Sequence, residues 1–284
     1  MHESTLTVTS NDDIDLQVYR WAPDREARAV VQIQHGLAEH AGRYRRFAQG
    51  LTEAGYLVYA PDARGSGRTV GGDYGAWGPD GWAGWVDDLD VVNRRIRRDN
   101  SGMRVAIFGH SMGSFATQQY LLEHADDVDA VILSGTGDPA GIAAMLASDA
   151  PTDLSAFNAP FENRTGFEWL SRDTAEVDAY VADPMCGWAA PSPAGIASLA
   201  RAAEPDALAA VRADLPVLLV SGSEDPVGGE GGAGVETVGR RYSEAGLREV
   251  DVRLYPGARH ELLNETNREE VTADVLEFLA RTVG

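Results

Sequence analysis

The chain has 284 residues, which suits one large α/β domain or a domain that carries an insertion. Its net charge of −20 disfavours binding to nucleic acid or to anionic lipid headgroups. All 24 basic residues are arginines, so chemistry that needs a lysine, such as a Schiff base or a P-loop, is excluded.

Hydrophobic patterning predicts alternating strands and helices up to about residue 137. Two segments that alternate apolar and polar residues flank a polar turn, which is typical of an antiparallel hairpin at a sheet edge. The strands expected in this half of the chain, including that hairpin, are at residues 5–9, 15–21, 30–33, 56–60, 104–108 and 128–133. The helices expected there are at residues 43–54, 85–98 and 111–124. This alternation predicts a mostly parallel sheet with helices on both faces.

The alternation stops after residue 137. Residues 138–204 contain no clear strand, and prolines separate several short helical pieces. We therefore predict a helical cap at residues 138–204, inserted into an α/β core formed by residues 1–137 and 205–284. The elements expected after the cap are strands at residues 216–220 and 250–255 and helices at residues 235–245 and 269–281.

The segment Gly109-His110-Ser111-Met112-Gly113 matches the Gly-x-Ser-x-Gly pattern of a nucleophile elbow. A predicted strand leads into it and a predicted helix follows it, as the elbow requires. Side chains two residues before or after the serine would collide with the neighbouring chain, which explains the glycines. The pattern predicts Ser111 as a nucleophile, and a serine hydroxyl needs a general base at neutral pH.

An acid and a histidine should follow the nucleophile in the chain. Asp225 and His260 each come just after a predicted strand, at the sheet edge where ligands bind. We predict that Asp225 fixes the imidazole tautomer and that His260 transfers the proton. Glu224 is the alternative acid. The alternative bases, which we expect to be structural, are His35, His40, His110 and His124.

Two backbone N–H groups are needed to bind the oxyanion of the reaction intermediate. Met112 follows the nucleophile directly and is expected to supply one of them. We assign the other to Leu37, in the loop after the third strand, where Gly36 permits a close backbone turn.

Two further motifs resemble a zinc site and a dinucleotide-binding site, but neither meets the requirements of such a site. His260-Glu261 begins like a zinc-protease motif, but Asn264 stands where the second histidine ligand should be. Residues 229–234 match the dinucleotide fingerprint, but Asp225 and Pro226 separate them from the preceding strand, so we expect a flexible loop. We therefore expect no cofactor and no metal.

The compartment is predicted from cysteine usage and from the absence of targeting signals. Cys186 is the only cysteine, so no internal disulfide or cysteine-rich metal site can form, and a reducing compartment fits. The N-terminus is polar, and no apolar run is long enough to span a membrane. We expect a cytoplasmic protein without an integral membrane segment, whose partner is a small-molecule ester and not a nucleic acid. Its oligomeric state stays open.

At these motifs the chain resembles the branch of the α/β hydrolases that contains monoglyceride lipases, lysophospholipases and serine aminopeptidase-like proteins. Residues 35–44 (His-Gly-Leu-Ala-Glu-His-Ala-Gly-Arg-Tyr) are close to a signature of that branch, and residues 109–113 and 221–227 also fit. The resemblance implies the α/β-hydrolase fold and the roles given above for Ser111, Asp225, His260, Leu37 and Met112. Residues 62–69 depart from the branch, because Ser66 and Thr69 replace its usual histidine and serine.

The expected reaction is hydrolysis of a carboxylic ester through an acyl-enzyme, with a monoacylglycerol or another single-chain, lysophospholipid-like ester as substrate. The cap residues that we expect to wall an acyl pocket are Phe157, Phe161, Trp169 and Trp188. Three alternatives stay open, namely a small-ester carboxylesterase, an amidase or aminopeptidase, and a ligand receptor with slow turnover. For an aminopeptidase, the candidate cap residues to hold the substrate amine are Glu162, Glu168 and Asp173.

Overall fold

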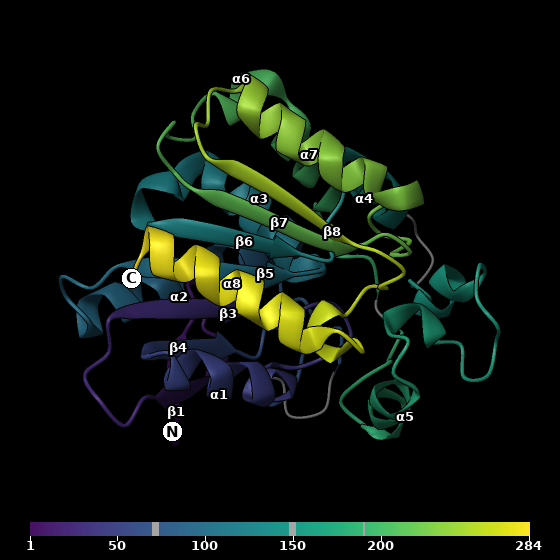
Figure 1. Ribbon diagram of the computed structural model, residues 1–284, viewed down its shortest axis with the longest axis horizontal. Helices are drawn as coiled ribbons and strands as arrows, with labels where there is room; N and C mark the ends of the chain where they lie inside the picture. Colours follow the sequence, from purple (N-terminus) through teal and green to yellow (C-terminus); the bar gives the residue numbers. More distant parts are fainter. Residues whose placement is uncertain (70–73, 148–151, 190) are drawn as a thin grey trace.

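A computed structural model describes residues 1–69, 74–147, 152–189 and 191–284 (Figure 1). Its centre is one eight-stranded sheet in the order β1-β2-β4-β3-β5-β6-β7-β8. The strands are β1 (His2–Thr9), β2 (Asp15–Ala22), β3 (Ala29–Gln34), β4 (Tyr56–Pro61), β5 (Val105–His110), β6 (Ala130–Ser134), β7 (Val217–Gly222) and β8 (Val250–Tyr255). β1 pairs antiparallel with β2, and β2 with β4, whereas all other neighbours are parallel. The predicted edge hairpin and mostly parallel sheet are therefore confirmed.

Helices cover both faces of the sheet (Figure 1). On one face, α1 (Arg45–Glu53) and α8 (Arg268–Thr282) bury side chains such as Phe47 and Phe278 in one cluster. The other face is covered by α2 (Gly81–Asp99), α3 (Met112–His124) and α7 (Ala233–Glu244), which contribute to a second cluster. The central strands β3 to β7 are buried along their whole length, which explains why most of their residues are apolar.

Two helix starts differ from the prediction because of contacts that are not visible in the hydrophobic pattern. The expected helix at residues 43–54 begins instead with a 3₁₀ turn, η1 (Ala41–Tyr44), because the His40 side chain caps it by accepting the Gly42 N–H. The expected helix at residues 85–98 starts earlier, at Gly81. The N–H of Trp82 donates to the carbonyl of Ala194, and this tertiary contact fixes the added turn.

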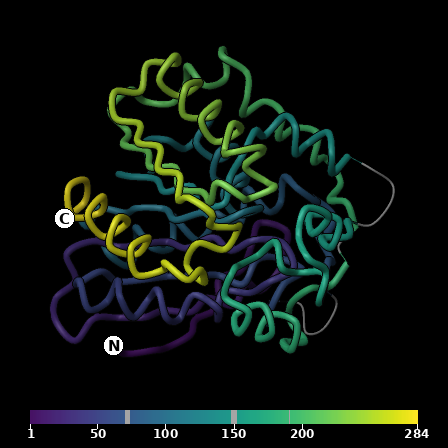
Figure 2. The backbone as a smooth tube through the Cα atoms, turned by 45° about the vertical axis from the view of Figure 1, so that its right-hand side comes forward, coloured from purple at the N-terminus to yellow at the C-terminus, as the bar shows by residue number. Residues whose placement is uncertain are grey.

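Between β6 and β7 the described residues form only short helices. These are α4 (Pro139–Leu146), η3 (Leu154–Asn158), η4 (Glu168–Leu170), α5 (Thr174–Ala182), η5 (Ile196–Ala203) and α6 (Pro205–Leu208). Residues 148–151 and 190 of the predicted cap lie outside the described residues. Leu146 and Leu199 join the core cluster of α3, whereas Trp169, Leu170 and Tyr180 form a small cluster of their own. Figures 1 and 2 show this teal segment around α5 at one end of the sheet.

None of the described helices has both the length and the apolar composition needed to cross a membrane. The remaining short elements are η2 (Ala125–Asp127), η6 (Glu230–Gly232) and η7 (Leu262–Asn264). η6 lies within the segment that matches the dinucleotide fingerprint. Gly231 and Gly232 adopt positive φ there, before α7 begins.

Candidate active site

Ser111 lies in the sharp turn between β5 and α3. Its φ of 49° and ψ of −121° are strained for a residue with a side chain. A Cβ atom at Gly109 would lie 2.7 Å from the Gly113 carbonyl oxygen, and one at Gly113 would collide with the carbonyl of Gln34. Both glycines are therefore required by close backbone contacts, and the turn has the geometry of a nucleophile elbow.

Asp225 and His260 come together at the ends of β7 and β8. The Nδ1 atom of His260 lies 3.0 Å from each carboxylate oxygen of Asp225, and both side chains are buried. Because a carboxylate can only accept, Nδ1 carries the proton and Nε2 is left as the basic nitrogen. Asp225 also accepts the Ser221 hydroxyl at 3.2 Å and the Val227 N–H at 2.9 Å, which fixes its orientation.

Two opposing effects determine the pKa of His260. Burial disfavours the imidazolium, but the adjacent Asp225 carboxylate outweighs burial, so the pKa of His260 is raised above its ordinary 6.5. His110 lies beside it, with ring centroids 4.8 Å apart. Burial and the neighbouring His260 lower the pKa of His110 to about 4, so His110 is neutral at neutral pH.

Gly135, which follows β6, makes room for this pair of imidazoles. A Cβ atom there would lie 2.8 Å from Cε1 of His110 and 3.0 Å from Cε1 of His260, and its φ of 55° also favours glycine. Our sequence reasoning missed this residue. Its position directly after a predicted strand could have indicated that it lies near the site.

The alternative acid and bases have other surroundings. Glu224 is exposed to solvent, unlike the buried Asp225. His35 is fixed between the Gly36 carbonyl and the Ala63 N–H, and Nε2 of His40 lies 2.9 Å from an oxygen of Asp183. His124 is partly exposed next to acidic side chains on α2 and η2. Of the four alternative bases, only His110 lines the pocket described next.

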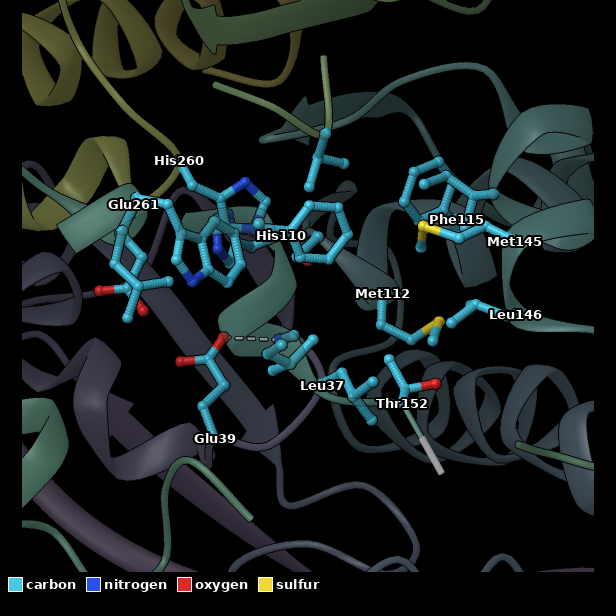
Figure 3. Close-up of a pocket in the computed structure, with 18 of the residues that line it drawn as sticks. Leu37, Glu39, His110, Met112, Phe115, Met145, Leu146, Thr152, His260 and Glu261 are labelled. Carbon is cyan, nitrogen blue, oxygen red and sulfur yellow. Dashed lines mark hydrogen bonds between the residues drawn. The ribbon is translucent and has the colours of Figure 1, made fainter. Parts of the chain in front are cut away.

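Ser111, His260, Leu37 and Met112 all line one pocket (Figure 3). In the described part of the chain, the N–H groups of Leu37 and Met112 donate to no protein acceptor, so both are available to an oxyanion. The described residues also contain no hydrogen bond between Ser111 and His260. Such bonds are often long in unliganded enzymes and tighten when substrate binds.

The pocket has a polar half and an apolar half. In Figure 3, His260, His110, Glu39 and Glu261 lie on one side, whereas Met112, Phe115, Met145 and Leu146 lie on the other. The apolar lining is completed by Leu37, Ile142, Leu154, Phe157, Trp169, Leu170 and Val227. The pocket can therefore receive a molecule with one polar and one apolar end.

The four predicted cap residues divide into two pairs. Phe157 and Trp169 line the pocket, and the indole ring of Trp169 lies 4.7 Å from the His260 ring. Phe161 and Trp188 are not among the described residues that line the pocket. Phe161 packs under the Arg259 guanidinium, and Trp188 stacks on Tyr74.

Sequence reasoning missed the contribution of α4. Ile142, Met145 and Leu146 project from this helix into the pocket. The apolar run Ile142-Ala143-Ala144-Met145-Leu146, directly after a strand and its loop, was a signal that could have identified them.

Glu39 and Glu261, in the polar half, share the guanidinium of Arg43. Arg43 donates to a Glu39 oxygen at 2.7 Å and binds Glu261 through both terminal nitrogens. Burial would raise the pKa of Glu39, but Arg43, the nearby His110 and His35 and the Gly36 N–H together outweigh burial and lower this pKa to about 2. Both carboxylates are therefore already paired with the one shared guanidinium of Arg43.

The segment that carries His260 is bonded to cap residues 168–173. The N–H groups of His260 and Glu261 donate to the carbonyls of Trp169 and Leu170, at 3.3 and 2.7 Å. Glu265, which is fully buried, accepts the N–H groups of Arg172 and Arg259 and the Nε of Arg172. Residues 168–173 of the predicted cap thus fix the loop that carries the predicted base.

Two groups of side chains could hold a metal ion by distance alone. They are His40, Asp183 and Cys186, and Asp90, His124 and Asp127. In both groups the histidine already has a carboxylate neighbour within 4 Å. Neither group lines the pocket that contains Ser111. That the reaction needs no metal and no cofactor stays a prediction.

Comparisons with known proteins agree with this arrangement. The profile of the family described as "Serine aminopeptidase, S33" matches residues 25–267. The monoacylglycerol lipase of Mycolicibacterium smegmatis is 34% identical over 267 residues, which cover 91% of this chain and 90% of that protein. The monoglyceride lipase of Rattus norvegicus is 28% identical, covering 90% and 82%.

Among solved structures, a thermostable carboxyl esterase from Bacillus coagulans, in complex with glycerol, is similar over the whole length of both chains. Its TM-score is 0.87 at 27% identity. The predictions of an α/β-hydrolase fold and of a carboxylic ester hydrolase are thereby confirmed. The chain belongs to the serine aminopeptidase S33 family, in the branch of the α/β hydrolases that contains the monoglyceride lipases.

Proposed function

We propose that this enzyme hydrolyses monoacylglycerols or closely similar single-chain esters through an acyl-enzyme on Ser111. The observation that carries the proposal is that the pocket lined by Ser111 has an apolar half and a polar half. An acyl chain would lie against Phe115, Met145 and Leu146. A small polyol headgroup would face the polar half.

In this mechanism His260 removes the proton of the Ser111 hydroxyl as the oxygen attacks the ester carbonyl. Asp225 accepts a hydrogen bond from the Nδ1–H group of His260, which keeps Nε2 basic and stabilises the imidazolium that forms. The N–H groups of Leu37 and Met112 bind the oxyanion. His260 then returns the proton to the leaving alcohol. In the second half of the reaction, water attacks the acyl-enzyme while His260 removes its proton. His260 then returns this proton to the Ser111 oxygen, and the acid is released.

The proposed substrate class follows from the pocket and from relatives. A monoacylglycerol lipase at 34% identity covers nearly the whole chain. Trp169 adds a buried indole N–H that has no partner in the described residues and could bind a substrate oxygen. The charge of −20 disfavours docking on anionic interfaces, so a dispersed or micellar ester suits the enzyme better than bulk triacylglycerol.

The aminopeptidase alternative has less support from the site. Of its candidate residues, Glu168 is bound by Thr165 and Asn158, Asp173 pairs with Arg268, and Glu162 is exposed. The pocket carboxylates Glu39 and Glu261 already have Arg43 as partner. A substrate ammonium would have to compete with this guanidinium for the two carboxylates.

The division into an α/β core and a helical cap and the cytoplasmic location also stay proposals.

The test is a series of p-nitrophenyl esters from acetate to palmitate, measured below micelle formation, together with a monoacylglycerol and an aminoacyl-nitroanilide. Each buried methylene contributes about 0.8 kcal/mol, so about four more methylenes should raise kcat/KM by about two powers of ten over acetate. The monoacylglycerol should be cleaved and the anilide should not. If kcat/KM instead falls steadily as the acyl chain lengthens from acetate, the substrate is a small ester and not a lipid.

A further inference from the structure

Ala38, in the loop that supplies the Leu37 N–H, has an unusual backbone conformation. Its φ is 54°, in the left-handed region that disfavours residues with a Cβ atom, and it is fully buried. Such a conformation persists only where its surroundings impose it. The contacts around Ala38 therefore identify what holds this loop in place.

The core holds the part of the loop that precedes Ala38. Nδ1 of His35 donates to the Gly36 carbonyl at 2.7 Å, and the Gly36 N–H donates to Glu39 at 2.6 Å. Tyr44 donates to the same Glu39 oxygen at 2.8 Å. The first contact holds the Gly36 carbonyl and the other two hold the Gly36 N–H, so all three act before Leu37, and none of them reaches the carbonyl of Ala38 on its other side.

The cap holds the Ala38 carbonyl. The Tyr180 hydroxyl and the Gly187 N–H both donate to this oxygen, each at 2.9 Å. Two residues further along the loop, His40 contacts Asp183 of the same cap segment at 2.9 Å. Residues 180–187 thus contact the loop at two points, and both lie directly after Leu37.

Tyr180 is well fixed for this contact. It is buried, with its ring 4.8 Å from the Arg43 guanidinium and 5.1 Å from the ring of Phe167. Burial, reinforced by the Glu261 carboxylate, raises the pKa of Tyr180 well above its ordinary value. The phenol therefore stays protonated and donates to the carbonyl at any pH at which the enzyme works.

We infer that cap residues Tyr180 and Gly187 hold Ala38 in its left-handed conformation and thereby keep the Leu37 N–H directed at the oxyanion. Tyr180 is then a positioning residue, and docking of the cap completes the oxyanion site. This inference rests on the proposed function. It assigns the cap a part in the chemical step in addition to its part in enclosing the substrate.

The test begins with Tyr180→Phe, which removes one of the two donors and keeps the ring. Losing an oxyanion donor outright costs about 100- to 1,000-fold in kcat. Because Gly187 remains, we expect a fall of roughly 10-fold in kcat, with KM changed by less than about twofold. The affinity for an alkyl boronic acid, which mimics the tetrahedral intermediate, should fall in parallel with kcat.

A second substitution tests whether strain at Ala38 is the cause. Glycine adopts positive φ without a steric penalty, so Ala38→Gly in the Tyr180→Phe background should restore most of the lost kcat. Ala38→Val in the otherwise unchanged enzyme should lower kcat at constant KM, which keeps the inference testable if Tyr180→Phe folds poorly. The matched control is Tyr242→Phe, which removes a buried hydroxyl of α7 that has no partner among the described residues, and it should leave kcat unchanged.

The outcomes separate this inference from the proposed function. An unmodified enzyme that does not hydrolyse esters would overturn the proposed function. If the unmodified enzyme is active but Tyr180→Phe keeps its kcat and its boronate affinity, or changes KM alone, the cap does not position the oxyanion site. A fall in kcat that Ala38→Gly fails to reverse would also overturn the inference.

Discussion

The two sides of the pocket are built in different ways. On the sheet side, Ser111, Asp225 and His260 follow β5, β7 and β8, and the regular parallel pairing of these strands fixes their positions. On the cap side, short helices hold Phe157 and Trp169 through a small apolar cluster and polar contacts to loops. The difference suggests that the sheet side supplies the nucleophile, acid and base, and that Phe157 and Trp169 on the cap side act mainly on the choice of substrate. Substitutions on the two sides should therefore have different kinetic signatures.

The largest effect is expected on the sheet side, at the nucleophile. Ser111→Ala removes one hydroxyl from a turn that the glycines and backbone already fix, so the melting temperature should change little. Ester hydrolysis should fall by about four to six powers of ten. Steady-state assay and thermal unfolding measure both quantities. Activity near that of the unmodified enzyme would mean that the reaction does not use this serine.

The next effect separates two adjacent carboxylates. Asp225→Asn should lower kcat by about four powers of ten, because the amide no longer selects the imidazole tautomer that leaves Nε2 basic. Glu224→Gln is the matched control, since its carboxylate is exposed, and it should cost less than about twofold. If the larger loss came from Glu224→Gln, the sheet side would have been assigned the wrong acid.

On the cap side we expect a smaller effect that depends on the substrate. Phe157→Ala removes an aromatic wall of the pocket and should lower kcat/KM for a medium-chain ester by roughly tenfold, with little change for acetate. Phe161→Ala is the control, because it removes a similar cap side chain that does not line the pocket. If Phe157→Ala lowered kcat/KM equally for both esters, this side chain would not act on the choice of substrate.

The smallest effect is a displacement along the pH axis. The raised pKa of His260 means that the imidazole stays protonated, and so inactive as a base, to higher pH than an ordinary histidine. The acid limb of kcat/KM should therefore have its midpoint above 6.5. His110→Asn should keep this limb, because His110 titrates at about 4. A midpoint near 4 that disappears in His110→Asn would identify His110 as the base.

The sequence predicted the sheet side well for a physical reason. The glycines around Ser111 are dictated by local backbone contacts, and the order of nucleophile, acid and base follows from the parallel topology. Local pattern therefore carried enough information to place Ser111, Asp225 and His260 near one another, and Leu37 and Met112 beside them.

The cap side was predicted less well because its contacts are not local. The sequence analysis expected four cap aromatic residues to wall the pocket, but it could not show that Phe157 faces the pocket while Phe161 packs under Arg259. The role of α4 and the bonds from Tyr180 and Gly187 to Ala38 depend on tertiary docking. The periodicity of apolar residues in the sequence does not predict contacts between distant segments.

The central claim is that Ser111 forms the acyl-enzyme, and covalent labelling tests it most directly. The protein is treated with a fluorophosphonate, which reacts with activated serines, and then analysed by intact mass and peptide mapping. We predict one adduct per chain, located on Ser111, formed in step with the loss of esterase activity and absent from Ser111→Ala. An adduct on another residue, or full inactivation of Ser111→Ala by the same reagent, would contradict the claim.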